Sequence, residues 1–383
     1  MYSLTGILLL LLFLNLLSCQ GNEMIKSENG RLLFVGSYTE NSDQGIEIYQ
    51  VDESGRLTLK SVQKNIDNPS YITISPDKKY LYAANELMNY TDKNGGYISS
   101  YSINQETGGL TFINKIFSEG GAPCYITTSN DGQFLLVSNY MQETVASFLV
   151  NNGKIEKAVS VIKHNGQGPN TNRQDASHMH SIRLDKKNNI AFAADLGADK
   201  VYVYDFDKEN GELSEKENSI SLAAGAGPRH FEFSKDGKTI YILNELNSTI
   251  EIFKINKENG NRNHIQTIST LPKDYSNKNY PADIHISPSG EYLYTSNRGH
   301  NSIAIFEIRK DDTLKMLGTN AVHGDWPRNF MIDPLGKYLL VANQKSKNIV
   351  TFSIEKNGGL TKIQSTTTIA SPVCLQVLNA DNK

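Results

Sequence analysis

The sequence predicts an all-β protein, a seven-bladed β-propeller whose N- and C-terminal strands pair to close the ring. A unit of four short strands recurs along the chain, and no segment after residue 30 has a sustained helical period of apolar residues. The two chain ends, in addition, each resemble one half of a hairpin. Repeats of about 50 residues that each contain four short strands are typical of propellers.

The clearest copy of the repeat covers residues 227–255. An apolar strand at 227–233 leads into a polar turn with Gly237, a second strand at 239–245 ends in an Asn and a Glu, and a third strand covers 249–255. The first strands begin at seven similar points, 45 to 55 residues apart: Pro69, Pro123, His178, Pro228, Pro281, Pro327 and Pro372. Seven starts predict seven blades.

The two ends of the chain are complementary. Residues 372–378 have the pattern of a first strand with nothing after it, and residues 32–38 have the pattern of a second strand without its first. We expect the two segments to share one blade, because a closed ring leaves no unpaired strand edge. Since each blade needs its neighbours to bury its faces, residues 31–383 are predicted to form one domain.

The first 30 residues differ from the rest. An apolar run from Leu8 to Leu14 is too short to span a bilayer and stops just before Cys19. This segment resembles a bacterial lipoprotein signal, which predicts a signal peptide at 1–18, and a lipidated Cys19 with a polar tether at 19–30. It departs from that pattern because residues 1–6 carry no Lys or Arg, and an ordinary signal peptide is the alternative. The expected location is extracytoplasmic, anchored to a membrane by lipid only, or cytoplasmic if no signal is present.

Composition narrows the choice of partners. The net charge is −3 and the pI is about 6.3, without a Lys/Arg-rich run, so a nucleic-acid partner is not expected. Cys124 and Cys374 fall near the starts of first strands two blades apart. They are predicted to be small packed residues rather than a disulfide.

Hairpin geometry predicts which polar residues meet. Arg229 and Glu245 each lie eight residues from Gly237, so antiparallel pairing would bring them to the same rim of the blade. Equal counts bring Arg328 to the same rim as Gln344. First strands line the channel of a propeller, and the side chains that open them should therefore converge at the channel mouth.

Two kinds of polar residue lie at this mouth. The Asn residues that end second strands recur in most blades and are predicted to cap turns: Asn85, Asn139, Asn244, Asn297 and Asn343. The charged residues break the repeat, since Cys124 takes the place of Arg229 and Val373 that of Arg328. Asymmetric charges on a symmetric scaffold indicate a site. A long irregular segment at 164–178 enters at the same rim, and its Arg173 could bind an anion there.

The motifs at this rim resemble those of the seven-bladed lactonases, a family that includes the propeller type of 6-phosphogluconolactonase and the fungal carboxymuconate lactonising enzyme. The matching pieces are GPN (168–170), RQ (173–174), HMHS (178–181), DLGAD (195–199), GPRH (227–230), NELNS (244–248), ADIH (282–285), NRG (297–299) and PRNF (327–330). They occur in order across the whole propeller. The resemblance implies a lactone as small-molecule substrate, no cofactor and no metal.

The resemblance also implies the site residues. By motif position, the catalytic group is predicted to be His180, Arg229, Glu245 and Arg298, with His178 as the competing choice for the histidine. The predicted substrate-binding residues, from geometry, are Arg173, His178, His230, Asp283, His285 and Arg328. A neutral imidazole could take a proton from water, a carboxylate could act as acid or base or orient that imidazole, and guanidinium groups could stabilise an oxyanion or hold a substrate anion.

The predicted reaction is hydrolysis of a sugar lactone to the aldonic acid. The resemblance implies 6-phosphogluconolactone, whereas an exported protein would better suit an unphosphorylated or carboxylated lactone. A lactonising cycloisomerase and a non-catalytic binding propeller are the alternatives. A metal site on His178 and His180, with Asp283 or His285 as a third ligand, is disfavoured because nearby arginines would repel a cation.

Overall fold

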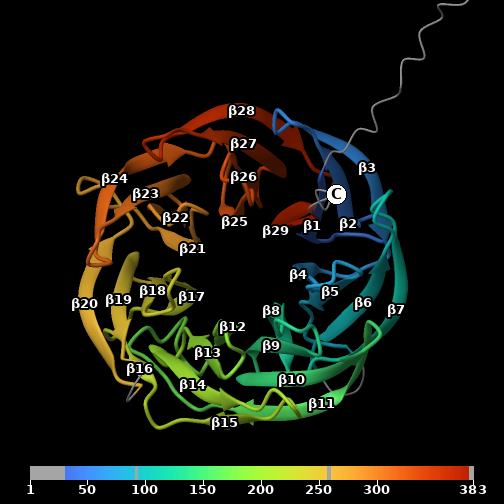
Figure 1. The fold of residues 1–383 in the computed structure, drawn as a ribbon, viewed down its shortest axis with the longest axis horizontal. Helices are drawn as coiled ribbons and strands as arrows, with labels where there is room; N and C mark the ends of the chain where they lie inside the picture. The colour runs from blue at the N-terminus through green and yellow to red at the C-terminus, as the bar shows by residue number, and fades with distance from the viewer. Residues whose placement is uncertain (1–30, 91–93, 257–259, 379–383) are drawn as a thin grey trace, which may run out of the picture.

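Figure 1 shows the ring of blades in the computed structural model, which describes residues 31–90, 94–256 and 260–378. Seven antiparallel sheets surround a central axis, and the described residues contain 29 strands and no α-helix. None of those residues forms a helix long and apolar enough to cross a membrane. The predicted seven-bladed propeller is confirmed.

Each blade has an inner strand, a second, a third and an outer strand. The inner strands are β4 (Pro69–Ile74), β8 (Gly121–Thr128), β12 (Met179–Leu184), β17 (Pro228–Phe233), β21 (Tyr280–Ile286), β25 (Pro327–Ile332) and β29 (Ser371–Leu378). The second strands are β5 (Tyr80–Asn85), β9 (Phe134–Met141), β13 (Ile190–Asp195), β18 (Thr239–Asn244), β22 (Tyr292–Arg298), β26 (Tyr338–Asn343) and β1 (Arg31–Tyr38).

The third strands are β6 (Tyr97–Ile103), β10 (Thr144–Asn151), β14 (Lys200–Phe206), β19 (Thr249–Ile255), β23 (Ser302–Ile308), β27 (Asn348–Ile354) and β2 (Gly45–Val51). The outer strands are β7 (Leu110–Phe117), β11 (Lys154–Lys163), β15 (Leu213–Glu215) with the short β16 (Ile220–Ser221), β20 (Arg262–Ser269), β24 (Leu314–Ala321), β28 (Leu360–Thr367) and β3 (Leu57–Lys64).

The last blade contains both ends of the chain. Its strand order is β29-β1-β2-β3, with Leu32 opposite Leu378 and Val35 opposite Leu375. This confirms the predicted closure of the ring. The hydrogen bonds of β1 thereby join the first and last segments of the propeller and leave no open edge between them.

Burial follows the position of each strand. Every residue of β18 is buried, whereas all residues of the outer strand β28 after Leu360 are exposed or partly buried. The core lies between neighbouring blades, where Tyr241 and Leu243 of one blade share a cluster with Ile284 and Leu293 of the next. Because each apolar face is covered by the adjacent blade, the sheets depend on one another for their burial.

A β-bulge interrupts the first hairpin of every blade. In β17 the pairing moves from Pro228 opposite Asn244 to His230 opposite Leu243, so Arg229 has no cross-strand partner. The extra residue shifts the backbone pairing from the equal counts, but Arg229 Nε still lies 3.0 Å from Glu245 Oε2, so the prediction that the two residues meet at one rim is confirmed. The bulged residues are Ser70, Cys124, His180, Arg229, Ala282 with Asp283, Arg328 and Val373.

Three of the five asparagines that end second strands join their hairpin to the segment that enters the blade. The side-chain amides of Asn85, Asn139 and Asn297 donate to carbonyl oxygens of that segment at 2.7, 2.8 and 2.8 Å. These contacts support the structural role predicted for them. Both Cys124 and Cys374 are buried free thiols, so the prediction that they form no disulfide is confirmed.

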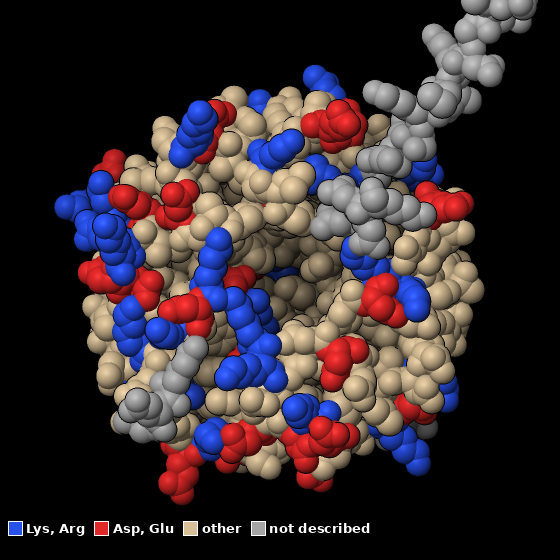
Figure 2. All heavy atoms as spheres, viewed as in Figure 1, with Lys and Arg blue, Asp and Glu red and all other residues tan. Residues whose placement is uncertain are grey.

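The propeller has two different faces. The inner strands begin, and the second strands end, at one face, while the hairpin turns between them lie at the other. Arg31 opens β1 and Leu378 closes β29, so the described chain starts and ends at the hairpin-turn face. Figure 2 shows a hollow at the centre of the ring on the face that it displays. Residues 1–30, with the predicted signal peptide, Cys19 and tether, lie outside the described residues.

Candidate active site

Two sets of side chains surround the mouth at which the inner strands begin. The first set consists of the bulged residues. In each second strand, one residue pairs with the inner-strand residue just before the bulge, and the second set consists of the residues that follow it. We call these the strand-end positions: Tyr38, Glu86, Tyr140, Leu196, Glu245, Arg298 and Gln344. The bulges direct one side chain per blade out of the regular alternation, as bulges beside active sites often do.

Glu245 lies at the centre of a cluster of three arginines. Its Oε2 accepts hydrogen bonds from Arg229 Nε at 3.0 Å and Arg298 Nη2 at 2.6 Å, and its Oε1 accepts one from Arg173 Nη2 at 2.6 Å. Burial opposes ionisation of this carboxyl, but the guanidinium groups of Arg298, Arg229 and Arg173 hold its pKa well below the usual range. Glu245 is therefore a fixed anion, and three cations around one carboxylate leave the cluster positively charged.

The three arginines come from distant parts of the sequence. Arg173 belongs to the irregular segment before β12, which reaches over the mouth as predicted, and Arg298 ends β22. Arg298 also donates its Nε to the Tyr280 carbonyl at 2.9 Å, and Arg229 donates an Nη1 hydrogen to the Ala282 carbonyl. Carboxylate and backbone contacts together hold the guanidinium planes in one orientation.

A series of hydrogen bonds between side chains also holds Arg229 in place. His230 Nδ1 lies 2.8 Å from Asp283 Oδ1, and His230 Nε2 lies 3.1 Å from Arg229 Nη1. Since a guanidinium can only donate, His230 Nε2 is the acceptor and Nδ1 carries the hydrogen. Burial and the charge of Arg229 lower the pKa of His230 to about 4, which keeps the ring neutral and able to accept that bond.

The same series of hydrogen bonds continues from Asp283 to His285. His285 Nε2 lies 3.0 Å from Asp283 Oδ2, and His285 Nδ1 lies 3.2 Å from Glu232 Oε1. Burial opposes its protonation, but these two carboxylates raise the pKa of His285 to about 10, so that both ring nitrogens donate. Asp283 and His285, which the sequence predicts to bind substrate, are linked to His230 by these bonds and are not among the residues that line the pocket described below, so their contact with substrate stays a prediction.

His180 and His178 lie on either side of Tyr140. His180 occupies the bulge of β12 with Nδ1 3.7 Å from Cys124 Sγ, and its ring contacts Tyr140 edge to face at 5.4 Å. Burial, and then the charge of Arg229, lower the pKa of His180 well below its usual value, so the imidazole is uncharged. His178 precedes the strand, stacks on Tyr140 at 4.5 Å and donates Nδ1–H to the Tyr140 carbonyl at 3.0 Å.

The bulge also changes the argument for a metal at these two histidines. Because it falls at His180, the alternation of a regular strand does not relate the two rings. In the part of the chain that the structure describes, no group of three or more His, Cys, Asp and Glu side chains is placed to hold a metal ion.

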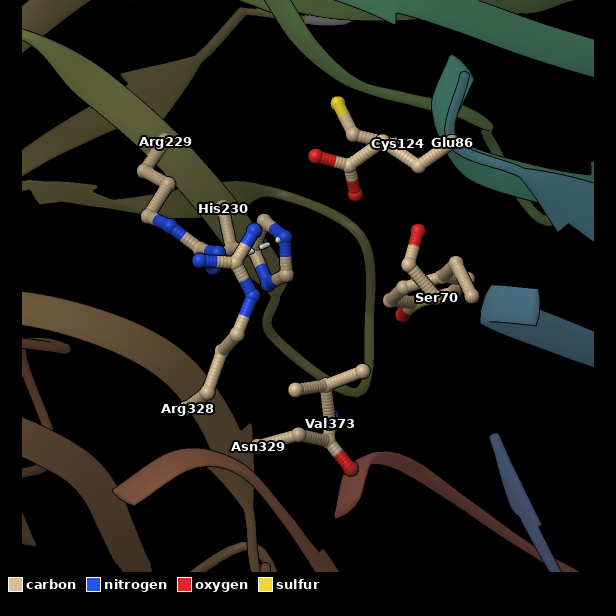
Figure 3. Close-up of a pocket in the computed structure, with 9 residues that line it drawn as sticks. Ser70, Glu86, Cys124, Arg229, His230, Arg328, Asn329 and Val373 are labelled. Carbon is tan, nitrogen blue, oxygen red and sulfur yellow. Dashed lines mark hydrogen bonds between the residues drawn. The ribbon is translucent and has the colours of Figure 1, made fainter. Parts of the chain in front are cut away.

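A small pocket opens between the bulged residues (Figure 3). It is lined by Ser70, Tyr71, Glu86, Cys124, Arg229, His230, Arg328, Asn329 and Val373. Figure 3 shows the guanidinium groups of Arg229 and Arg328 on one side, and the carboxylate of Glu86 directed toward them from the other. The arginines thus face a wall of small and apolar side chains that carries one acid.

Arg328 is the less constrained of the two pocket arginines. Within the described ranges no carboxylate pairs with it, and its guanidinium carbon lies 5.3 Å from the centre of the Tyr38 ring. Its positive charge is close enough to lower the pKa of Arg229, after the larger effect of burial. A guanidinium free of ion pairs beside a pocket is suited to bind a carboxylate or phosphate of a ligand.

The structure therefore brings the predicted residues to one mouth, but only some of them line the pocket. Arg229, His230 and Arg328 line the pocket, and His180 and Glu245 contact its lining residues Cys124 and Arg229. Arg298 contacts Glu245 and does not itself reach the pocket lining. Sequence reasoning did not include Glu86 among the site residues. A signal for it was present, because Glu86 occupies in its blade the same strand-end position that Glu245 occupies three blades further along.

Known proteins resemble this chain over almost all of the propeller. The family described as lactonase, 7-bladed β-propeller, matches residues 32–377. The 6-phosphogluconolactonase of Bacillus subtilis is 33% identical over 279 residues, which cover 72% of this chain and 77% of that one. That of Formosa agariphila is 36% identical over 301 residues, covering 76% and 84%.

A solved structure also resembles this chain over most of its length. The periplasmic gluconolactonase of Pseudomonas aeruginosa superimposes with a TM-score of 0.84 at 31% identity, covering 91% of this chain and 99% of that one. The family match and the match of fold are consistent with the arginine-rich mouth described above. The chain belongs to the family of seven-bladed β-propeller lactonases.

Proposed function

We propose that this lactonase hydrolyses a sugar lactone to the corresponding aldonic acid in the pocket between Arg229, Arg328 and Glu86. The observation that carries the proposal is the pair of guanidinium groups that face a carboxylate across a small pocket at the channel mouth. The names of two relatives, 6-phosphogluconolactonase and periplasmic gluconolactonase, support a lactone of an aldonic acid as substrate class.

The arginines would supply the electrostatic part of the catalysis. Attack of water on a lactone carbonyl produces a tetrahedral intermediate whose oxygen carries a negative charge. Arg229 is held by Glu245 and His230 with its guanidinium at the pocket wall, so it needs little reorganisation when that charge develops. Arg328, which has no carboxylate partner among the described residues, would attract the anionic group of a substrate or share the oxyanion.

Glu245 is better suited to hold the arginines than to transfer protons. A carboxylate bonded to three guanidinium groups has a pKa far below neutrality. Its oxygen atoms already accept hydrogen bonds from those groups and are therefore poorly placed to accept a proton. His180 is uncharged, as a general base must be, but it is only 4% exposed and does not line the pocket. We therefore propose that both residues shape the arginine cluster and the wall behind Cys124.

The substrate can be identified by acid release. The purified protein, offered fresh glucono-δ-lactone and 6-phosphogluconolactone in a pH-stat, should accelerate ring opening of one or both above the spontaneous rate. A preference for the phosphorylated lactone that disappears in Arg328→Met would identify Arg328 as the phosphate-binding residue. No acceleration with either lactone would reject the proposed function in favour of the cycloisomerase or binding-propeller alternatives.

We also propose that the protein is exported and anchored through Cys19, in which case an unphosphorylated lactone is the more accessible substrate. The periplasmic location in the name of the Pseudomonas relative supports export. Since Arg31 lies at the hairpin-turn face, a tether ending there would leave the pocket mouth on the side away from the membrane. Labelling with a radioactive fatty acid should mark the protein and should be lost in Cys19→Ser; equal labelling of that variant would exclude the anchor.

A further inference from the structure

We propose that Glu86 is the catalytic carboxylate of this site, the group that accepts a proton from the attacking water and returns it to the leaving oxygen. The inference rests on the proposed lactone hydrolysis and adds a residue to it. Three observations carry the argument: the contacts of the Glu86 carboxylate, the contrast with Glu245, and the geometry of the pocket.

Glu86 is held at one oxygen and open at the other. Tyr38 Oη donates a hydrogen bond to Glu86 Oε2 at 2.8 Å, while the backbone of Glu86 is fixed by its N–H bond to the Asn68 carbonyl at 2.9 Å. Within the described residues no other side chain bonds the carboxylate and no cation lies within ion-pair distance. Glu86 Oε1 is therefore available to a water in the pocket, and the Tyr38 contact keeps the carboxylate in one orientation.

Glu245, at the equivalent position of another blade, is a carboxylate that is poorly suited to accept a proton. Both residues follow the Asn that ends a second strand, but three guanidinium groups occupy the oxygens of Glu245 and none bonds Glu86. A proton acceptor needs a free lone pair and a pKa that allows it to hold a proton briefly. Of the two equivalent carboxylates, Glu86 alone keeps an oxygen free for that task.

The pocket places this acceptor opposite the groups that would stabilise the oxyanion. Figure 3 shows the Glu86 carboxylate directed across the pocket toward Arg229 and Arg328. A lactone held with its carbonyl oxygen against the arginines would present its carbonyl carbon to a water on the Glu86 side. The proton acceptor can then reach the attacking water while the arginines reach the developing oxyanion, as general base catalysis of acyl transfer requires.

The step balances with water as the only co-reactant. The oxygen of water bonds to the carbonyl carbon, its proton passes to Glu86 Oε1, and the electron pair of the carbonyl moves to the oxygen beside Arg229. The intermediate then re-forms the carbonyl, the bond from that carbon to the ring oxygen breaks, and the Glu86 proton passes to the leaving oxygen as a hydroxyl. Glu86 is again ionised, and the product acid releases its own proton to solvent.

Glu86→Gln tests the proposal because it keeps the shape of the side chain and removes the proton acceptor. With whichever lactone the wild-type protein hydrolyses, we expect kcat to fall by about 10²–10⁴ with a much smaller change in KM. Glu86→Asp should recover part of the loss, and His180→Gln should lose less than Glu86→Gln. The matched control is Glu156→Gln, the same chemical change on the exposed strand β11.

A second variant separates catalysis from a structural role. Tyr38→Phe keeps the Glu86 carboxylate and removes the hydrogen bond that orients it, so kcat should fall with little change in KM. Activity of Glu86→Gln within threefold of wild type, or a larger loss in His180→Gln, would overturn the inference. If Glu86→Gln does not fold, an unchanged kcat in Tyr38→Phe would overturn it. A wild-type protein without lactonase activity would instead reject the proposed function itself.

Discussion

Replacing Arg229 with Met is expected to lower kcat/KM for the lactone substrate by about 10²–10³, the usual effect of removing one oxyanion-stabilising group. Met keeps much of the aliphatic volume of the side chain but carries no charge and donates no hydrogen bond. Arg229 is the one residue that both lines the pocket and belongs to the Glu245 cluster, so its loss removes positive charge where the intermediate develops its negative charge. The measurement is steady-state acid release over a range of lactone concentrations.

Two controls isolate that effect. Arg309→Met removes a cation from an exposed position far from the mouth and should leave kcat/KM unchanged. Thermal unfolding of Arg229→Met shows whether a loss of activity merely reflects a loss of the fold. We expect the variant to fold, because Glu245 keeps Arg173 and Arg298 as partners. Wild-type kcat/KM in a folded Arg229→Met protein would contradict the electrostatic role proposed for this arginine.

Glu245→Gln should have the largest effect on stability. Breaking a buried ion pair by removing one partner typically costs about 3–5 kcal/mol of the free energy of unfolding, since the remaining charge stays buried without compensation. Here the carboxylate is 2% exposed and holds three arginines, two of them buried as well. Urea unfolding of wild type and Glu245→Gln, with Glu156→Gln as control, measures the difference; a change no larger than that of the control would contradict it.

The pH dependence of stability provides a second readout for the same variant. In the folded protein the pKa of Glu245 lies well below the value of 4.5 usual for an unfolded chain. A depressed carboxyl pKa stabilises the fold fully above the unfolded value, and this contribution is lost as pH falls from about 4.5 toward the folded pKa. The unfolding free energy of wild type should therefore decline more steeply below pH 4.5 than that of Glu245→Gln. Equal slopes would show that Glu245 is not a buried, paired anion.

Most of the fold was accessible from the sequence because it repeats. Turn residues such as Gly237 and the apolar strands on either side recur at similar spacing, and seven copies reinforce one another. Closure by residues 32–38 and 372–378 was predictable for the same reason, since each segment matches half of a known unit. A bulge in each inner strand was not predictable, because one extra residue changes the register without changing the spacing pattern of the hairpin.

The candidate site, like the fold, could be predicted from the sequence only in part. The sequence was sufficient to indicate that Arg229, Glu245 and Arg298 belong together, since family motifs and blade positions both place them at one mouth. It could not indicate which carboxylate is bound and which is open, because Glu86 and Glu245 occupy equivalent positions in their blades. Their difference arises from neighbours that are remote along the chain.

Periodicity is a local property, and it was enough to predict the number of blades, the closure of the ring and the rim at which the polar residues gather. The state of each ionisable group depends on distances between blades, which no local pattern encodes. Arg173 reaches Glu245 across 72 positions of sequence, and Tyr38 reaches Glu86 across 48. Folding the ring brings these charges together, and the fields of those neighbours make one carboxylate a structural anion and leave the other free to act.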